Sequence, residues 1–188
     1  MKYDKNYLRK KYIFQRRKKH FSVKKFNFSL VFKLIKKKFS SKKITIAGYY
    51  PSNYEVNVLY FLKQASKKNY KIALPVIGSS NNMKFKPWIF ESPLYINKFG
   101  ILEPQKLEKE IVPDLVMVPL VSYDSKLNRI GYGKGYYDRI LKKINKIKKR
   151  AVFLGIAYSF QKCANIPTNK HDFKLDYIFT EQGIISSN

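Results

Sequence analysis

The chain has 188 residues, 45% of them hydrophobic, and its 39 Lys and Arg against 12 Asp and Glu give a formal net charge of +27. This hydrophobic content argues against the disordered class, which combines high charge with low hydrophobicity, and the length suits one folded domain over residues 1–188. One cysteine, Cys163, and two histidines, His20 and His171, exclude an internal disulfide and disfavour a zinc site, which fits a cytoplasmic location.

The hydrophobic pattern predicts helices and strands that alternate along the chain. Apolar residues recur at helical spacing in segments 5–20, 28–38 and 55–67. Apolar, β-branched runs predict buried strands at 44–49, 71–75, 115–119, 151–157 and 176–180, and the alternating segment 83–88 predicts an antiparallel edge strand. We therefore expect an α/β fold of three layers with a central, largely parallel sheet flanked by helices, and residues 1–40 as N-terminal helices packed on that core.

The segment after the predicted strand 115–119 is the most informative part of the sequence. It reads V-P-L-V-S-Y-D and then N-R-I-G-Y-G-K-G-Y-Y-D-R, from Val118 to Arg139. The alternating Gly131, Gly133 and Gly135 let the backbone approach a ligand closely. Open α/β sheets collect their ligands at the carboxyl ends of their strands, which is where this segment begins.

A predicted helix follows these glycines and carries one apolar face, made of Tyr137, Ile140, Leu141, Ile144 and Ile147. A glycine-rich loop that leads into a helix N-terminus suits phosphate, because free N–H groups and the helix dipole both favour an anion. The spacing matches neither the P-loop nor the dinucleotide-binding fingerprint. From the residues alone, a phosphate site and a simple tight turn both stay open.

The run from Arg129 to Asp138 resembles the signature of the 5-formyltetrahydrofolate cyclo-ligase family, N-R-L-G-R-G-K/G-G-Y-Y-D preceded by V-P-G-x-x-F-D. Other segments are similar to that family in the same order: K-N-Y-L-R at 5–9, Y-P-S-N-Y-E-V at 50–56, F-G-I-L-E-P at 99–104, G-I-A-Y at 155–158 with Gln161, and Pro167, His171, Asp172 and Asp176 near the end. The resemblance thus covers essentially the whole chain. Two positions depart from it, since Tyr132 replaces an arginine and Leu120 replaces a glycine.

This resemblance implies an ATP-dependent enzyme that converts 5-formyltetrahydrofolate to 5,10-methenyltetrahydrofolate. In the implied reaction the formyl oxygen attacks the γ-phosphorus of ATP, and N10 then closes the ring on the phosphorylated formyl group to release ADP and phosphate. Such chemistry requires positioning, Mg²⁺ and charge stabilisation rather than a protein nucleophile, and we expect Cys163 to be a small buried or half-buried side chain. The expected partners are ATP and 5-formyltetrahydrofolate, including its polyglutamylated forms. The protein itself is expected to be a monomer.

The resemblance also implies roles for individual residues. Lys134 and Arg129 are the candidate catalytic residues, and Asp138 and Asp172 are the candidate Mg²⁺ ligands. The candidate ATP-binding residues are Lys5, Arg9, Arg129, Ile130, Gly131, Tyr132, Gly133, Lys134, Gly135, Tyr136 and Tyr137. The candidate substrate-binding residues are Glu55, Gly133, Lys134, Gly135 and Tyr136.

Each role has a purely structural alternative. Lys5 and Arg9 also fit a solvated helix face, and Glu55 fits the first turn of a helix. Asp138 also fits a helix cap, Asp172 a turn, and Tyr137 packing beneath the loop.

The charge of +27 raises the alternative of a basic RNA-associated protein, because polycations release counterions from phosphates. The lysines are spread along the chain together with Ile, Asn, Tyr and Phe, whose codons are also A/T-rich. This pattern favours compositional drift over dedicated RNA binding, and no specific nucleic acid is expected. No apolar run approaches the ~18 residues that cross a bilayer, so no membrane is expected. A third possibility is a folate-binding member of the family with weakened catalysis, which Tyr132 suggests.

Overall fold

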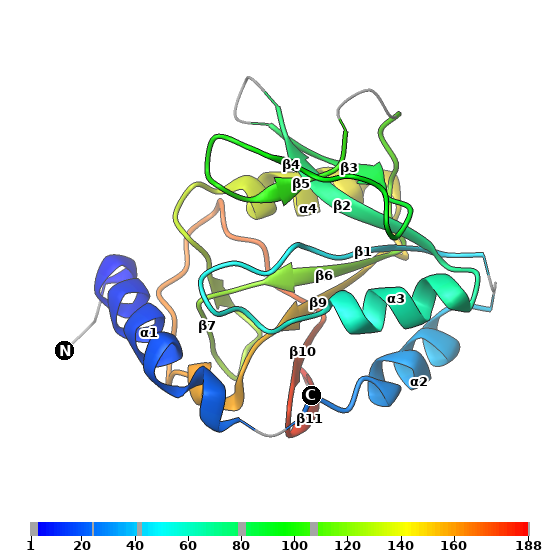
Figure 1. The fold of residues 1–188 in the computed structure, drawn as a ribbon. Helices are drawn as coiled ribbons and strands as arrows, with labels where there is room; N and C mark the ends of the chain where they lie inside the picture. The colour runs from blue at the N-terminus through cyan, green and yellow to red at the C-terminus, as the bar shows by residue number, and fades with distance from the viewer. Residues whose placement is uncertain (1–3, 24, 41–42, 79–81, 106–108, 188) are drawn as a thin grey trace.

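The computed structural model describes residues 4–23, 25–40, 43–78, 82–105 and 109–187 (Figure 1). A seven-stranded sheet forms its centre, in the order β11-β10-β9-β6-β1-β2-β3. The bounds are β1 (Thr45–Ala47), β2 (Lys71–Ile77), β3 (Met83–Pro87), β6 (Leu115–Pro119), β9 (Val152–Ile156), β10 (Tyr177–Thr180) and β11 (Gly183–Ser186). Two small two-stranded sheets flank it: β4 (Tyr95–Ile96) with β5 (Leu102–Glu103), and β7 (Ser122–Tyr123) with β8 (Arg129–Ile130).

The five inner strands of the central sheet are parallel, which confirms the predicted fold class. β3 pairs antiparallel with β2 at one edge, as its alternating pattern predicted. At the other edge the short strand β11 pairs antiparallel with β10 through a two-residue turn, in which Thr180 faces Gly183. The sequence pattern did not reveal β11, because four residues give too short a run to show periodicity.

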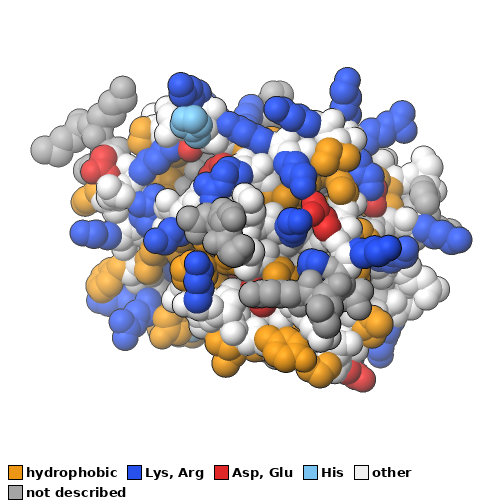
Figure 2. Space-filling view, turned by 90° about the horizontal axis from the view of Figure 1, so that it is seen from above, with side chains coloured by type: hydrophobic (Ala, Val, Ile, Leu, Met, Phe, Trp, Pro, Cys, Tyr) orange, Lys and Arg blue, Asp and Glu red, His pale blue; other side chains and the backbone are white. Residues whose placement is uncertain are grey.

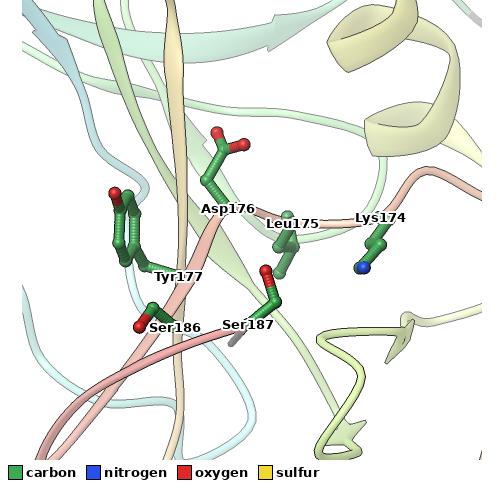
Figure 3. Close-up of a pocket in the computed structure, with 6 residues that line it drawn as sticks. All are labelled: Lys174, Leu175, Asp176, Tyr177, Ser186 and Ser187. Carbon is green, nitrogen blue, oxygen red and sulfur yellow. The ribbon is translucent and has the colours of Figure 1, made fainter.

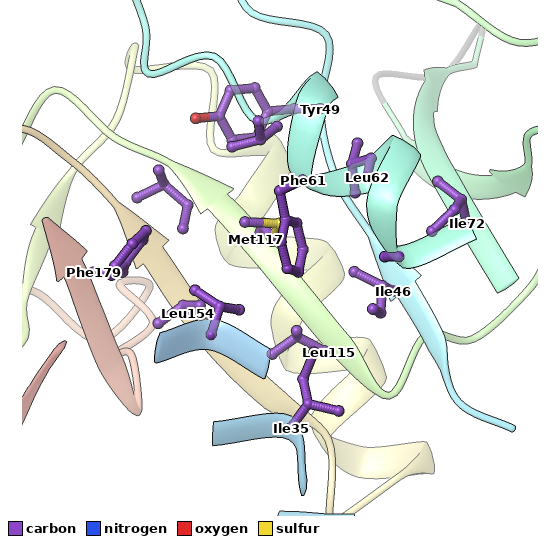
Figure 4. Close-up of a cluster of buried hydrophobic side chains, with 14 of the residues drawn as sticks. Ile35, Ile46, Tyr49, Phe61, Leu62, Ile72, Leu115, Met117, Leu154 and Phe179 are labelled. Atoms are coloured by element: carbon purple, nitrogen blue, oxygen red, sulfur yellow. The ribbon is translucent and has the colours of Figure 1, made fainter. Parts of the chain in front are cut away.

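Helices cover both faces of this sheet. α2 (Ser29–Lys38) and α3 (Leu59–Lys67) pack on one face, where Ile35 and Phe61 lie beside Met117 and Leu154 (Figure 4). On the opposite face, Ile140, Leu141 and Ile144 of α4 (Tyr136–Ile147) pack against the sheet. These apolar faces produce the three expected layers.

Two details of the predicted helices were wrong. Glu55 does not lie in a helix, because Asn53 and Tyr54 adopt left-handed backbone angles, with φ of 48° and 62°, and α3 begins only at Leu59. Ile147 is 59% exposed rather than part of the apolar face, because α4 ends there.

α1 (Lys5–Lys19) lies at one end of the sheet rather than on a face (Figure 1). The Asp4 side chain caps it by accepting from the backbone N–H of Asn6 and of Tyr7. Its buried residues Leu8 and Tyr12, one turn apart, pack with Val121 and Ile130. α1 thereby docks against β7, β8 and the 3₁₀ turn η2 (Ser159–Gln161), with a further 3₁₀ turn η1 (His20–Ser22) at its own end.

The order of the strands creates a switch point between β1 and β6. From β1 the chain passes through α3 to β2 on one side, and from β6 it passes through α4 to β9 on the other. Because α3 and α4 lie on opposite faces, the connections that leave the carboxyl ends of β1 and β6 diverge, which is where open α/β sheets form their ligand crevice. None of the described helices is long and apolar enough to cross a membrane.

Gly155, in the middle of β9, leaves no space for a side chain. A Cβ atom there would lie 2.5 Å from Ile178 Cδ1, 2.7 Å from Leu175 Cδ1 and 2.9 Å from Leu120 Cδ2. We expect Gly155→Ala to lower the free energy of unfolding by about 1–3 kcal/mol through overpacking, as measured by chemical denaturation. Gly78→Ala is the control, because its nearest neighbour is 3.5 Å away. Equal stability of Gly155→Ala and wild type would contradict this account of the core.

Candidate active site

The expected site residues gather at the carboxyl edge of the sheet. Glu55 follows β1, the glycine loop 131–135 follows β6 through the β7–β8 hairpin, and α1 lies across this end of the molecule. Residues 157–172, which follow β9, complete the arrangement with Asp172. Sequence elements that are far apart thus converge at the switch point.

The glycine loop leads directly into α4. Gly135 occupies the N-cap in a left-handed conformation with φ of 66°, and no side chain caps the helix there. The first-turn N–H groups of α4 therefore remain available to an anion. Arg9 Nε donates to the Gly131 carbonyl at 2.8 Å, and a Cβ atom on Gly133 would lie 3.3 Å from the Arg9 guanidinium carbon. Arg9 thus lies against the loop at Gly133.

Arg129 is the buried cation beneath this loop. Its side chain is 3% exposed, and its NH2 group donates to Asp138 Oδ1 at 2.6 Å. Burial lowers the pKa of Arg129, and the Asp138 carboxylate opposes that effect. The guanidinium carbon lies 5.9 Å from the centre of the Tyr137 ring.

Two buried polar groups in this region lack hydrogen-bond partners within the described structure, namely Arg129 Nε and the Tyr137 hydroxyl. Tyr137 packs against the α4-side core, as its helical position predicted, and burial raises the pKa of its hydroxyl. Unpaired buried groups are rare in native proteins, because each loses its hydration without replacement. These two mark the place where a polar ligand would restore hydrogen bonds.

The two predicted Mg²⁺ ligands lie close together, and each is paired with a cation. Lys5 Nζ contacts both carboxylate oxygens of Asp172, at 2.7 and 2.5 Å. The next residue, Phe173, donates its backbone N–H to Asp138 Oδ1 at 3.2 Å. Lys5 of helix α1 therefore supplies a counter-charge to Asp172, which lies beside the Arg129–Asp138 pair.

Asp138 has an oxygen that fits a Mg²⁺ ion shared with phosphate, whereas both oxygens of Asp172 contact Lys5, which Mg²⁺ would have to displace. Mg²⁺ binds oxygen ligands and usually takes only one or two carboxylates from the protein. Asp138 Oδ2 accepts no hydrogen bond from the described residues, so it is available to a cation. Groups of three or more His, Cys, Asp or Glu that could hold a metal do not occur in the described part of the chain, so phosphate oxygens and water would complete the coordination.

Lys134 lies exposed at the tip of the glycine loop, and it makes no hydrogen bond or ion pair with the described residues. It is therefore a mobile cation beside the helix N-terminus. Tyr136 is half-buried, with its ring centre 6.2 Å from that of Phe99 and the Arg139 guanidinium stacked at 5.4 Å. The Ile130 side chain is buried against Leu8 and Tyr12 of α1.

Glu55 is held at both of its carboxylate oxygens. The Tyr132 hydroxyl donates to Oε1 at 2.8 Å, and the Ser52 backbone N–H donates to Oε2 at 2.9 Å. Burial raises the pKa of Glu55, and the hydrogen bonds from Ser52 and Tyr132 oppose that effect. The Tyr132 oxygen in turn accepts a hydrogen bond from Arg16 of α1.

Sequence reasoning missed Arg16, which is 1% exposed. Arg16 follows Tyr12 by four residues and Leu8 by eight, so it continues the buried face of α1. That spacing was the available signal, but the many neighbouring Lys and Arg residues concealed it.

A pocket of about 330 Å³ lies elsewhere, at the amino end of β10 (Figure 3). It is lined by Lys174, Leu175, Asp176, Tyr177, Ser186 and Ser187, none of them a predicted site residue. We place the site at the carboxyl edge, because the cations, the free helix N-terminus and the unpaired buried donors all lie there.

The chain is similar to proteins of known activity. It matches the 5-formyltetrahydrofolate cyclo-ligase family over residues 1–181. The 5-formyltetrahydrofolate cyclo-ligase of Haemophilus influenzae is 32% identical over 136 residues, which cover 69% of this chain and 72% of that protein. The corresponding protein of Escherichia coli is 28% identical over 142 residues, covering 72% and 77%.

Two solved structures share the fold. The 5,10-methenyltetrahydrofolate synthetase of Aquifex aeolicus superimposes with a TM-score of 0.72 at 27% identity, covering 97% of this chain and 92% of that one. The synthetase of Mycoplasma pneumoniae gives a TM-score of 0.69 at 25% identity, covering 95% and 99%.

The two ion pairs of the site should differ in their effect on stability. Asp138→Asn leaves the buried Arg129 without its counter-charge, so we expect the free energy of unfolding to fall by roughly 3 kcal/mol. Asp172→Asn is the matched control, because Lys5 and Asp172 are each about a quarter exposed and water screens their pair, so a loss below about 1 kcal/mol is expected. Chemical denaturation without ligands measures both, and equal losses would contradict the assigned difference in burial.

Proposed function

The chain belongs to the 5-formyltetrahydrofolate cyclo-ligase family, and we propose that its carboxyl-edge site binds ATP with Mg²⁺ on the glycine loop and the folate at Glu55. The enzyme converts 5-formyltetrahydrofolate to 5,10-methenyltetrahydrofolate at the expense of ATP. One observation supports this assignment of the site above all others. Tyr132, within the loop proposed to hold phosphate, donates a hydrogen bond to Glu55, so the two proposed substrate positions adjoin each other.

ATP would lie with its phosphates over the glycine loop. The uncapped first turn of α4 offers N–H groups to the phosphate oxygens, and Arg9 and Lys134 add positive charge from either side. Arg129, buried below, has an unpaired Nε, and its guanidinium lies 5.9 Å from the centre of the Tyr137 ring, whose hydroxyl is also unpaired in the described structure. Such preorganised donors stabilise a transferring phosphoryl group without reorganising during the reaction.

Asp138 and Asp172 are the residues that would hold Mg²⁺, which neutralises charge on the phosphate oxygens when it is bound. Both carboxylates are already positioned by ion pairs, Asp138 with Arg129 and Asp172 with Lys5. Their cations would then remain close enough to contact the phosphates.

Glu55 would bind the pterin ring by accepting hydrogen bonds from its amino and ring N–H groups. A carboxylate does this best when it is ionised. Burial raises the pKa of Glu55, whereas the Ser52 and Tyr132 donors stabilise the charged form.

The proposed reaction proceeds in two steps. The formyl oxygen attacks the γ-phosphorus, an O–P bond forms, and the bond to the leaving ADP breaks. The lone pair of N10 then attacks the formyl carbon, the C–O bond breaks to release phosphate, and N10 loses its proton. Lys134 and Arg129 stabilise the charge on the phosphoryl group during both steps.

This reaction requires no nucleophile from the protein. Cys163 is buried, as expected, and burial raises the pKa of its thiol, which disfavours the reactive thiolate. Catalysis would therefore rest on positioning and electrostatic stabilisation.

The positive charge suits polyanionic substrates. Lys and Arg side chains are spread over the visible face rather than gathered into one stripe (Figure 2). A positively charged surface attracts ATP and polyglutamylated folates. The monomeric state, the cytoplasmic location and the lack of a specific nucleic acid partner stay predictions.

Lys134→Ala tests the phosphate site. The near-ultraviolet absorbance of the methenyl product is followed with 5-formyltetrahydrofolate, ATP and Mg²⁺, and the rate should require both ATP and Mg²⁺. We expect kcat/KM to fall by about 100-fold, because a cation that stabilises the transferring phosphoryl group is lost. The exposed Lys67→Ala, at the far end of α3, should retain the wild-type rate. Wild-type kinetics in Lys134→Ala would refute the role of this lysine, and a well-folded but inactive wild type would refute the activity.

Asp172→Asn tests the Mg²⁺ ligands. We expect the Mg²⁺ concentration for half-maximal rate to rise by at least about tenfold, because a carboxylate ligand is lost. Folate binding without ATP and Mg²⁺ should stay unchanged, since Asp172 faces Lys5 rather than Glu55. Glu110→Gln is the matched control, because that carboxylate pairs with Lys84 and Lys143 instead. An unchanged Mg²⁺ requirement in Asp172→Asn would remove it from the metal site.

A further inference from the structure

We propose that Tyr132 is a positioning residue for Glu55 and that the buried Arg16 of α1 holds Tyr132 in place. This inference rests on the folate-binding role proposed above for Glu55. It assigns the Tyr132 side chain to the folate rather than to ATP, although Tyr132 lies in the glycine loop. It also gives α1 a part in folate binding through a residue that need not touch the substrate.

Arg16 is a buried cation without a direct counter-charge. Its side chain is 1% exposed, and it forms no ion pair with the described residues. One guanidinium nitrogen donates to the Leu120 carbonyl at 3.1 Å, and another donates to the Tyr132 hydroxyl. Burying an isolated charge is costly, so the structure must offset it nearby. The nearest negative charge along these hydrogen bonds is the Glu55 carboxylate, which the Tyr132 hydroxyl links to Arg16.

The direction of these hydrogen bonds is determined by chemistry. A guanidinium can only donate, so the Tyr132 oxygen is the acceptor, and its single O–H is left for Glu55 Oε1. Burial and the Glu55 carboxylate raise the pKa of Tyr132, so the hydroxyl keeps its proton. The positive charge of Arg16 polarises this O–H and strengthens its bond to the carboxylate.

Tyr132 and Ser52 together fix the orientation of the carboxylate. Tyr132 holds Oε1 and the Ser52 N–H holds Oε2, so the plane of the carboxylate is set before a ligand arrives. The two donors come from different segments, one after β1 and one between β8 and α4. Tyr132 therefore couples the position of the glycine loop to the orientation of the folate-binding group.

Charged and titratable groups from several segments interact electrostatically with Glu55. They are Arg16 of α1, Tyr132 of the loop, Tyr49 after β1, Tyr137 of α4 and Tyr158 after β9. Arg16 is the cation in this set, and the tyrosines are neutral near pH 7. Without the Tyr132 hydroxyl, Glu55 would lose a donor that favours its charged form, and its pKa would rise further.

Tyr132→Phe removes the hydroxyl and keeps the ring, and Tyr60→Phe, at an exposed position on α3, is the matched control. We expect the KM for 5-formyltetrahydrofolate to rise by roughly tenfold in Tyr132→Phe, because a hydrogen bond to a charged group is lost. The KM for ATP should stay within about twofold of wild type. The acidic limb of kcat/KM for folate should shift to higher pH, because Glu55 would be protonated at higher pH than before. Tyr60→Phe should match wild type in all three readouts.

A double-mutant cycle with Glu55→Gln separates positioning from general loss of structure. If Tyr132 acts through Glu55, adding Tyr132→Phe to Glu55→Gln should weaken folate binding by much less than tenfold, whereas independent effects would multiply and overturn the inference. Arg16→Lys keeps the charge but loses the forked geometry, so we expect a folate-selective rise in KM here too. A rise in the KM for ATP alone would assign the hydroxyl to the phosphate site and overturn the inference.

Equilibrium binding of 5-formyltetrahydrofolate without ATP distinguishes this inference from the proposed function. An inactive wild type would refute the reaction, yet roughly tenfold weaker binding by folded Tyr132→Phe would still support the role of Tyr132. Equal folate affinity of Tyr132→Phe and wild type overturns the inference even when the wild type is fully active. Thermal unfolding of each variant confirms that the folded proteins are being compared.

Discussion

The contact between α1 and the carboxyl edge of the sheet is the interaction on which the site depends. Leu8 and Tyr12 anchor the helix in a small apolar cluster, apart from the two cores that hold the sheet and its covering helices together. Three cations of this helix contact three separate partners. Lys5 contacts Asp172, Arg9 donates to the Gly131 carbonyl, and Arg16 donates to the Tyr132 hydroxyl. Because they are four and seven residues apart, they lie on one face of the helix and reach the site together.

The electrostatics of the site favour binding over stability. Arg129 and Arg16 are both buried cations. Arg129 has Asp138 as a direct counter-charge and Arg16 has none among the described residues, and each has an Nε without a partner in the described structure. Burying such groups costs free energy that an apolar core would save. A ligand with several phosphate charges would recover part of that cost on binding. The site is therefore organised around its substrates at the expense of the free protein.

The sequence revealed the layers of the fold better than the geometry of the site. Apolar runs predicted the inner strands, because burial on both faces of a parallel sheet leaves a strong signal. Apolar residues at helical spacing predicted the helices. The predicted start of α3 was wrong because Asn53 and Tyr54 adopt left-handed backbone angles. A sequence pattern does not mark such angles at non-glycine residues. The resemblance named Glu55, the glycine loop and Asp172 as candidate site residues. It could not show that Tyr132 faces Glu55 or that Arg16 is buried, since both depend on how α1 docks.

The docking of α1 also packs it against the one cysteine of the chain. Cys163, the single thiol of the chain, lies in the same small cluster as Leu8 and Tyr12, and the Tyr12 hydroxyl donates to the carbonyl of the adjacent Lys162 at 3.0 Å. Because the thiol is buried in this cluster, its reactivity toward a thiol reagent reports on how tightly α1 packs against the edge. Alkylation of the free protein therefore measures local opening of this cluster, and a ligand that binds only while α1 is docked slows alkylation once its concentration exceeds its dissociation constant.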